Sequence, residues 1–83
     1  MNRCPVCFFE PLPWPAENHN ICICCGTEFG LDDFDFTHAE LRNKWITAGY
    51  PWFASEFPPP ENWDPAAQII KGLGVRFDSR RSA

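Results

Sequence analysis

Two short stretches near the start of the chain decide its fold: Cys4-Pro5-Val6-Cys7 and Cys22-Ile23-Cys24-Cys25-Gly26. Each stretch contains two cysteines that are separated by two residues, and fourteen residues lie between the two stretches. A C-x-x-C turn directs two sulfur atoms at one point, and two such turns supply the four ligands of a tetrahedral zinc site. The sequence therefore predicts one structural Zn²⁺ ion held by four thiolates.

The second stretch contains three cysteines, so the two that bind the metal have to be identified. Gly26 directly follows Cys25, and the residue after the last sulfur of a metal-binding turn often needs the positive φ that glycine adopts freely. This favours Cys22 and Cys25 as the pair and leaves Cys24 as a spare thiol. The first turn has Phe8 where the second has Gly26, so the two turns are not perfect copies. We expect the metal ligands to be Cys4, Cys7, Cys22 and Cys25.

Disulfide bonds and redox catalysis are disfavoured as explanations of the cysteine pairs. The first pair begins at residue 4 with no signal-peptide pattern before it, and five cysteines is an odd number. A thioredoxin-like motif would place a helix after Cys7, but Pro11, Pro13 and Pro15 prevent a helix there. Metal binding is therefore the preferred interpretation.

The two histidines are alternative metal ligands that the pattern does not favour. His19 lies between the cysteine pairs and could replace a cysteine, but Asn18-His19-Asn20 is typical of a polar turn. His38 follows Thr37 at the start of a predicted helix, which indicates a surface or capping position. An outer position near the metal remains open for His38.

The length of 83 residues makes a structural metal useful for stability. A chain of this size often has a marginal hydrophobic core, and small structural zinc sites contribute apparent binding free energies of roughly 10–16 kcal/mol. We expect one domain in which removal of the metal unfolds at least the N-terminal half.

The charge of the chain disfavours nucleic acid as a partner. Seven basic and eleven acidic residues give a formal net charge of −4, and four thiolates with one Zn²⁺ would add two more negative charges. Zinc ribbons that bind nucleic acid use basic surface. No apolar run approaches the length of a membrane span, so we expect a soluble, cytoplasmic protein without membrane contact. The acidic run contains Glu28, Asp32, Asp33, Asp35 and Glu40.

The rest of the chain is predicted to add two helices to the metal-binding turns. Residues 1–30 should form a zinc-ribbon-like module with short strands around its turns. The capping box Thr37-His38-Ala39-Glu40 predicts a helix within 37–49, from about His38 to Ala48. Asp64-Pro65 begins a short helix within 64–72, and residues 73–83 form a tail. The expected fold class is a small α+β domain stabilised by metal.

Thirteen aromatic residues and nine prolines suggest both a core and a contact surface. Most of the aromatic residues should build the core, and we assign Phe8, Phe29, Trp45 and Trp63 to it. The segment 50–63 combines aromatic residues with Pro58-Pro59-Pro60, which favours polyproline II. Its residues Trp52, Phe53 and Phe57 are the candidate surface for an unknown protein partner.

Several separated motifs follow one another along the chain: Cys4–Cys7, Cys22–Gly26, Phe29-Gly30, the acidic run, Thr37–Ile46, Trp52-Phe53 and Pro58–Pro65. Together they resemble a family of small bacterial cysteine-rich proteins of the CPCC type. The resemblance covers about residues 3–71 and implies a zinc-ribbon-like module followed by helices, in the cytoplasm of a bacterium or its phage. It implies the same four cysteine ligands but no particular activity. Phe8 departs from the family's glycine, and residues 72–83 fall outside the pattern.

The preferred function is therefore a non-catalytic zinc-binding protein that acts as an interaction, adaptor or inhibitor module. One alternative is a rubredoxin-like iron protein for electron transfer, because iron accepts the same four thiolates. A nucleic-acid-binding zinc ribbon is another. Catalysis is disfavoured because four cysteines close the site, whereas catalytic zinc keeps one ligand position open. A second metal at Asp32, Asp33, Asp35 and His38 is also disfavoured, since capping and solvation explain these residues.

Overall fold

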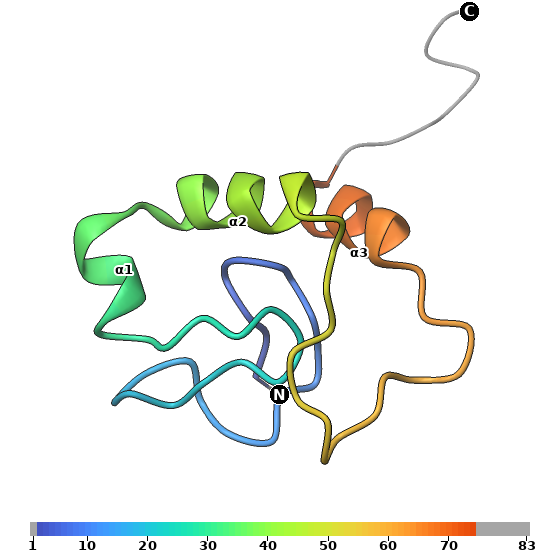
Figure 1. Cartoon of the computed structure of the whole chain (residues 1–83), viewed down its shortest axis with the longest axis horizontal. Helices are drawn as coiled ribbons and strands as arrows, with labels where there is room; N and C mark the ends of the chain where they lie inside the picture. Colours follow the sequence, from blue (N-terminus) through green and yellow to red (C-terminus); the bar gives the residue numbers. More distant parts are fainter. Residues whose placement is uncertain (1, 75–83) are drawn as a thin grey trace, which may run out of the picture.

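Three helices and a set of N-terminal turns make up residues 2–74, which are the residues described by the computed structural model (Figure 1). The helices are α1 (Asp32–Asp35), α2 (His38–Thr47) and α3 (Pro65–Leu73). The N-terminal turns lie beneath α2 in this view, and the segment between α2 and α3 passes alongside them before it returns to α3. The predicted tail lies outside the described residues from position 75 onward.

The short strands expected around the cysteine turns do not form within residues 2–74. Strand pairing there is limited to two isolated antiparallel bridges, Asn2 with Leu12 and Ile21 with Glu28. Prolines at 11, 13 and 15 cannot donate backbone hydrogen bonds, so the first arm cannot extend into a ladder. The expected small domain with helices and a four-cysteine cluster that could hold a metal is thus confirmed, but the zinc-ribbon knuckles and the strands of an α+β fold are not.

Helix α2 begins at the predicted capping box. The Thr37 side chain accepts a hydrogen bond from the Glu40 amide at 3.1 Å, and the Glu40 carboxylate accepts one from the Thr37 amide at 2.8 Å. The helix ends at Thr47, and Gly49 follows with a φ of +94°. Trp45 is the buried residue of α2 and fixes the face that packs on the turns.

Helix α3 starts as predicted but ends later than predicted. Asp64 accepts a hydrogen bond from the Ala67 amide at 3.1 Å, and Pro65 takes the first helical position. The helix was predicted within 64–72, yet it continues through Gly72 to Leu73, and Gly74 caps the end with a φ of +76°. A Cβ atom at position 72 would overlap the ring of Phe8. Glycine is needed there for close packing.

Helix α1 is a single turn that the sequence pattern did not predict. Its side chains form the hydrogen bonds that hold it: Asp32 accepts from the Glu28 amide at 2.8 Å, and Asp33 accepts from the Gly30 amide. None of its residues is buried. The acidic run therefore folds through its own carboxylates and not through hydrophobic packing.

The core combines the cysteine turns with aromatic side chains. Aromatic rings pack in a continuous row, in which Trp52 lies edge to face with Phe9 at 5.3 Å and with Trp63 at 5.0 Å between ring centroids. Trp63 in turn lies 6.4 Å from Trp45. The expected core residues Phe29 and Trp45 are buried, and Phe8 and Trp63 are half-buried. The buried apolar set is Cys4, Val6, Cys7, Phe9, Leu12, Cys22, Ile23, Cys24, Phe29, Trp45, Ala54 and Ile69.

Candidate metal centre

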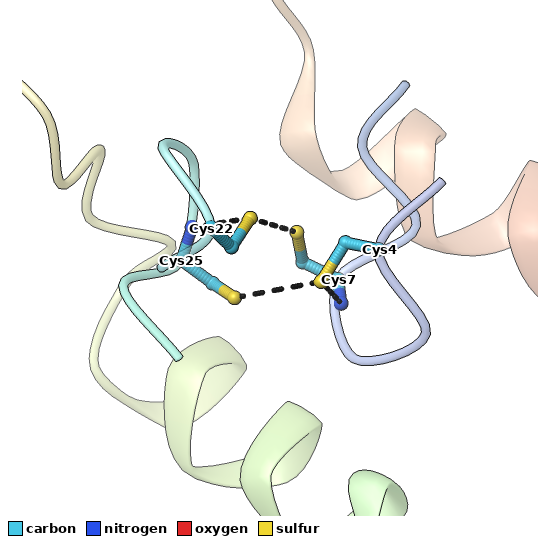
Figure 2. Close-up of side chains that lie close together, drawn as sticks. All are labelled: Cys4, Cys7, Cys22 and Cys25. Atoms are coloured by element: carbon cyan, nitrogen blue, oxygen red, sulfur yellow. Dashed lines mark hydrogen bonds between the residues drawn. The ribbon is translucent and has the colours of Figure 1, made fainter. Parts of the chain in front are cut away.

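The four predicted cysteines converge on one point between the two N-terminal turns (Figure 2). Their Sγ atoms all lie within 4.8 Å of one another. The sulfur of Cys4 lies 3.8 Å from that of Cys25, and the sulfur of Cys7 lies 3.7 Å from that of Cys22. A tetrahedral site with metal–sulfur bonds of about 2.3 Å has sulfur–sulfur edges of about 3.8 Å. The cluster therefore has the dimensions of a four-thiolate metal site.

The same distances exclude disulfides between these cysteines in this structure. A disulfide joins its sulfur atoms at about 2.05 Å, far shorter than the observed separations. All five cysteines are free thiols.

The two turns share one backbone conformation. The Phe8 amide donates to the Cys4 carbonyl at 2.9 Å, and the Gly26 amide donates to the Cys22 carbonyl at the same distance. Within each turn, two further amides point at the first sulfur: Val6 and Cys7 donate to Cys4 Sγ at 3.4 Å. The matching donors to Cys22 Sγ are Cys24 and Cys25, at 3.4 and 3.5 Å. Such donors stabilise negative charge on sulfur, which suits a metal-bound thiolate.

Phe8 adopts the left-handed conformation that Gly26 adopts in the other turn. Its φ is +71°, compared with +82° for Gly26. A residue with a Cβ atom pays about 1–2 kcal/mol for this conformation. The Phe8 ring lies 4.3 Å from the Arg42 guanidinium and packs on Gly72, and these contacts offset the backbone cost.

Each turn is held by a different part of the chain. Arg42 in α2 donates to the carbonyls of Val6 and Pro5, at 2.6 and 3.0 Å, and Gln68 in α3 donates to the carbonyl of Cys7 at 2.9 Å. The first turn is thereby fixed to both long helices.

The second turn is held by the segment between α2 and α3. The amides of Phe53 and Ala54 donate to the carbonyls of Cys24 and Ile23, at 3.0 and 2.9 Å. Sequence reasoning missed Arg42, Gln68 and this backbone pairing. The spacing of the cysteines carries no signal for partners that lie 36 and 61 residues away.

The hydrogen bonds among the four cysteines shift the pKa values of the two turns in opposite directions, up for Cys4 and Cys7 and down for Cys22 and Cys25. Hydrogen bonds from Cys22, Cys4 and Cys7 lower the pKa of the Cys25 thiol. The pKa of Cys7 is raised, first through its hydrogen bond with Cys22 and further because the thiol is buried. A metal ion would have to displace the protons that the first turn retains.

Cys25 is the cysteine of the cluster that lies closest to solvent. It is half-buried, whereas the other three cysteines of the cluster are fully buried, and its sulfur lies 3.2 Å from the Thr27 hydroxyl. It borders an open groove of about 350 Å³ between the second turn and α2, whose lining includes Thr27, Leu41 and Trp45. Solvent can therefore reach the cluster at the sulfur of Cys25.

The alternative ligands do not join the cluster. Cys24 is buried, but its sulfur faces the Gln68 amide at 3.7 Å. His19 lies in a turn with its ring exposed and 3.3 Å from the Glu28 carboxylate. His38 pairs with Asp33 at 3.1 Å. No second group of three or more potential metal ligands converges among residues 2–74, so the acidic run does not assemble a second site there.

The three candidate partner residues also have structural roles. Trp52 is half-buried, and its indole N–H donates to the carbonyls of Ala54 and Phe57 at 2.8 Å. The Phe53 ring covers Gly26, where an added Cβ atom would lie 2.6 Å from it. Phe57 packs edge to face on Trp14, with the ring centroids 5.9 Å apart. Their use by a partner stays a prediction.

Comparisons with known proteins do not assign the chain to a family. No family model matches it, and no solved structure matches it. A segment of 40 residues is 40% identical to the protein named short-chain dehydrogenase/reductase family 42E member 1 of Xenopus laevis. The match covers 48% of this chain but a tenth of that protein's length. Within residues 2–74, no helix has both the length and the apolar character needed to cross a membrane.

Proposed function

We propose that this chain is a non-catalytic zinc-binding domain whose metal organises a surface for a protein partner. The observation that carries the metal assignment is the pair of sulfur–sulfur distances, 3.7 and 3.8 Å, which match the edges of a zinc–thiolate tetrahedron. The shared backbone of the two turns supports their interpretation as a pair of zinc knuckles. The resemblance to CPCC-type proteins supports the same ligands and a cytoplasmic, bacterial setting.

The proposal excludes catalysis at the metal because the protein supplies all four ligands. Catalytic zinc sites hold the metal with three protein ligands and leave a position for water or substrate. Here the fourth ligand, Cys25, is held in place by the Gly26 turn and by the Thr27 hydroxyl. The function then lies in what the folded domain presents to another molecule.

A protein partner fits the charge better than nucleic acid does. The net charge is −4, and the bound site would make it more negative. A surface of this sign repels phosphate and attracts basic protein surface.

Iron is the second candidate metal, with electron transfer as its function. Amide donors to the Cys4 and Cys22 sulfurs and one solvent-facing ligand suit an iron–thiolate site as well, because hydrogen bonds to sulfur and exposure set the potential of such sites. The two functions differ in a simple readout. A colourless protein with one equivalent of zinc supports our proposal, and a coloured protein whose iron is reversibly reduced would replace it with electron transfer.

The ligand set is tested by elemental analysis of the purified protein and its cysteine variants. We expect one zinc per chain in the native protein and in Cys24→Ser, which is the matched control from the same turn. Cys22→Ser and Cys7→Ser should lose tight binding because each leaves three thiolates. Retention of one tightly bound zinc by both of these variants would overturn the assignment.

A further inference from the structure

Three large apolar side chains around α1 are exposed to solvent. Phe34 is 83% exposed, Leu31 is 56% exposed and Phe36 is 42% exposed. Leu31 and Phe34 are three residues apart on one helical turn and therefore lie on the same side of it. We call Leu31, Phe34 and Phe36 the α1 patch. A phenylalanine as exposed as Phe34 contributes almost nothing to the core, so folding does not explain it.

The segment that carries the α1 patch is fixed in place despite burying nothing. A helix of four residues is not stable alone. Here Asp32 and Asp33 accept backbone hydrogen bonds at its start, and Asp33 also pairs with His38 in α2. Lys44 lies 4.2 Å above the Phe36 ring. These polar contacts fix the α1 segment, with its exposed apolar side chains, at one end of the molecule (Figure 1).

The charge around the α1 patch is mainly negative, although Lys44 of α2 lies over one of its rings, that of Phe36. Between Gly26 and Leu41 the chain has no lysine or arginine, and this stretch contains the whole acidic run. Asp35 is exposed, and no hydrogen bond or ion pair engages its side chain within the described residues. An occupant of this surface must offer apolar side chains next to positive charge.

We propose that the α1 patch is the docking site for a basic amphipathic segment of a partner protein. Apolar side chains of that segment cover Phe34 and Leu31, and its lysines or arginines face Asp35 and the neighbouring carboxylates. The proposal rests on the proposed function, because it names the partner class and places the contact at α1. Nucleic acid and anionic membranes are poor occupants, because both repel the acidic run.

The competing aromatic surface is weaker on the same criteria. Phe53 and Phe57 are 57% and 40% exposed, but their rings already cover Gly26 and Trp14. Phe34 has no aromatic or cationic ring contact within the described residues, and it is the most exposed of the large apolar side chains there. The α1 patch is therefore the freer of the two surfaces.

The test uses the full, metal-loaded chain and a labelled synthetic peptide of lysine and leucine that forms an amphipathic helix. A peptide with glutamate in place of lysine is the charge control. Binding is measured by fluorescence anisotropy at two salt concentrations. We expect the lysine peptide to bind more tightly at low salt and the glutamate peptide not to bind.

Two matched pairs of variants locate the contact. Phe34→Ser should weaken lysine-peptide binding about tenfold, as removal of a central aromatic anchor does, whereas Phe57→Ser should leave it within about twofold. Asp35→Asn should weaken binding about twofold to threefold and reduce its salt dependence, whereas Glu61→Gln should do neither. Equal losses for Phe34→Ser and Phe57→Ser, or no binding by the native chain, would overturn the docking site.

Two further measurements separate this proposal from its rivals. All variants should keep one zinc per chain. If the native, zinc-loaded chain does not bind the lysine peptide, the result counts against the α1 patch and leaves the metal assignment standing. Replacing Arg76, Arg80 and Arg81 by glutamine tests whether the chain's own C-terminal residues occupy the patch. Peptide binding that becomes tenfold tighter would assign the patch to these residues and overturn the separate partner.

Discussion

Phe8 shows how one residue can break a local rule and still fit the fold. It takes the left-handed conformation of the metal-binding turn, where the second turn has glycine. Its ring packs on Arg42 and on Gly72, so the cost of the backbone is met by contacts from both long helices. The residue that makes the two turns look different in sequence therefore links the first turn to α2 and α3.

Replacing Phe8 by two small residues separates these effects. We expect Phe8→Gly to lower the free energy of unfolding by about 1–2 kcal/mol, because the loss of ring burial exceeds the relief of the backbone. Phe8→Ala should be less stable than Phe8→Gly by about 1 kcal/mol, since alanine keeps the backbone cost and loses the ring. Urea unfolding of the metal-loaded proteins measures both. Equal stability of the two variants would contradict the backbone cost.

Cys25 should be the first cysteine to react when the metal is absent. Hydrogen bonds from Cys22, Cys4 and Cys7 lower its pKa, so more of it is thiolate at neutral pH, and it is the one ligand that is half-exposed. Brief treatment of the metal-free chain with iodoacetamide, followed by peptide mass mapping, should show Cys25 modified several-fold ahead of Cys7. The metal-loaded protein is the control and should react slowly at every ligand. Modification of Cys7 first would contradict the structure.

At the scale of elements, the caps of α2 and α3 could be predicted, because the residues that form them are neighbours in sequence. Thr37 with Glu40 starts α2, and Asp64 with Pro65 starts α3. The end of α3 could not be predicted, because Gly72 is kept inside the helix by a ring from the other end of the chain. The strands do not form because the prolines at 11, 13 and 15 cannot donate the backbone hydrogen bonds that a strand ladder needs. The sequence therefore predicts features made by neighbouring residues, such as helix caps, but not contacts between distant residues, such as that of Phe8 with Gly72.

Helix α1 should depend on its own carboxylates. The Gly30 amide donates to Asp33, which lowers the pKa of that carboxyl below its ordinary value of 3.8. Asp33→Asn should weaken this bond and the contact with His38. We expect the Gly30 amide to exchange with solvent several-fold faster at neutral pH. Asp35→Asn is the control, and an unchanged rate in Asp33→Asn would contradict the assigned role.

For the whole molecule, the metal should stabilise more than the N-terminal half that the sequence suggested. The first turn is hydrogen-bonded to α2 through Arg42 and to α3 through Gln68, so the packing of both helices depends on the cysteine cluster. Chelation should therefore reduce helical circular dichroism as well as release zinc. Loss of a site worth roughly 10–16 kcal/mol exceeds what a core of this size can replace. A metal-free chain with the full helical signal would contradict this coupling.

Metal affinity should rise with pH. In the metal-free cluster the pKa of Cys4 is raised, chiefly through its hydrogen bonds with Cys22 and Cys25, and that of Cys7 is raised as well. These two thiols keep their protons at neutral pH, and binding must expel them. The affinity should fall as the pH is lowered from about 8 to 6, with proton release measurable by calorimetry in two buffers. An affinity independent of pH would contradict protonated thiols in the first turn.

The convergence of four of the five cysteines could be predicted from spacing alone, whereas the residues that hold the turns could not. Arg42 and Gln68 are ordinary polar helix residues in the sequence, and only the fold brings them to the carbonyls of the first turn. The candidate partner residues Trp52, Phe53 and Phe57 were chosen for their proline-rich neighbourhood. The exposure of Phe34 could not be predicted, because an apolar residue within an acidic run is as compatible with the core as with the surface.

The unequal support of the two turns has a consequence for the order in which the molecule assembles. Both turns close through bonds between near neighbours, such as Phe8 with Cys4 in the first turn and Cys22 with Thr27 in the second. Their distant supports differ: the second turn is held by Phe53 and Ala54, whereas the first turn has to wait for Gln68, which is synthesised later. We therefore expect the second pair of cysteines to bind the metal first, and the first turn, although it is synthesised first, to reach its final structure last.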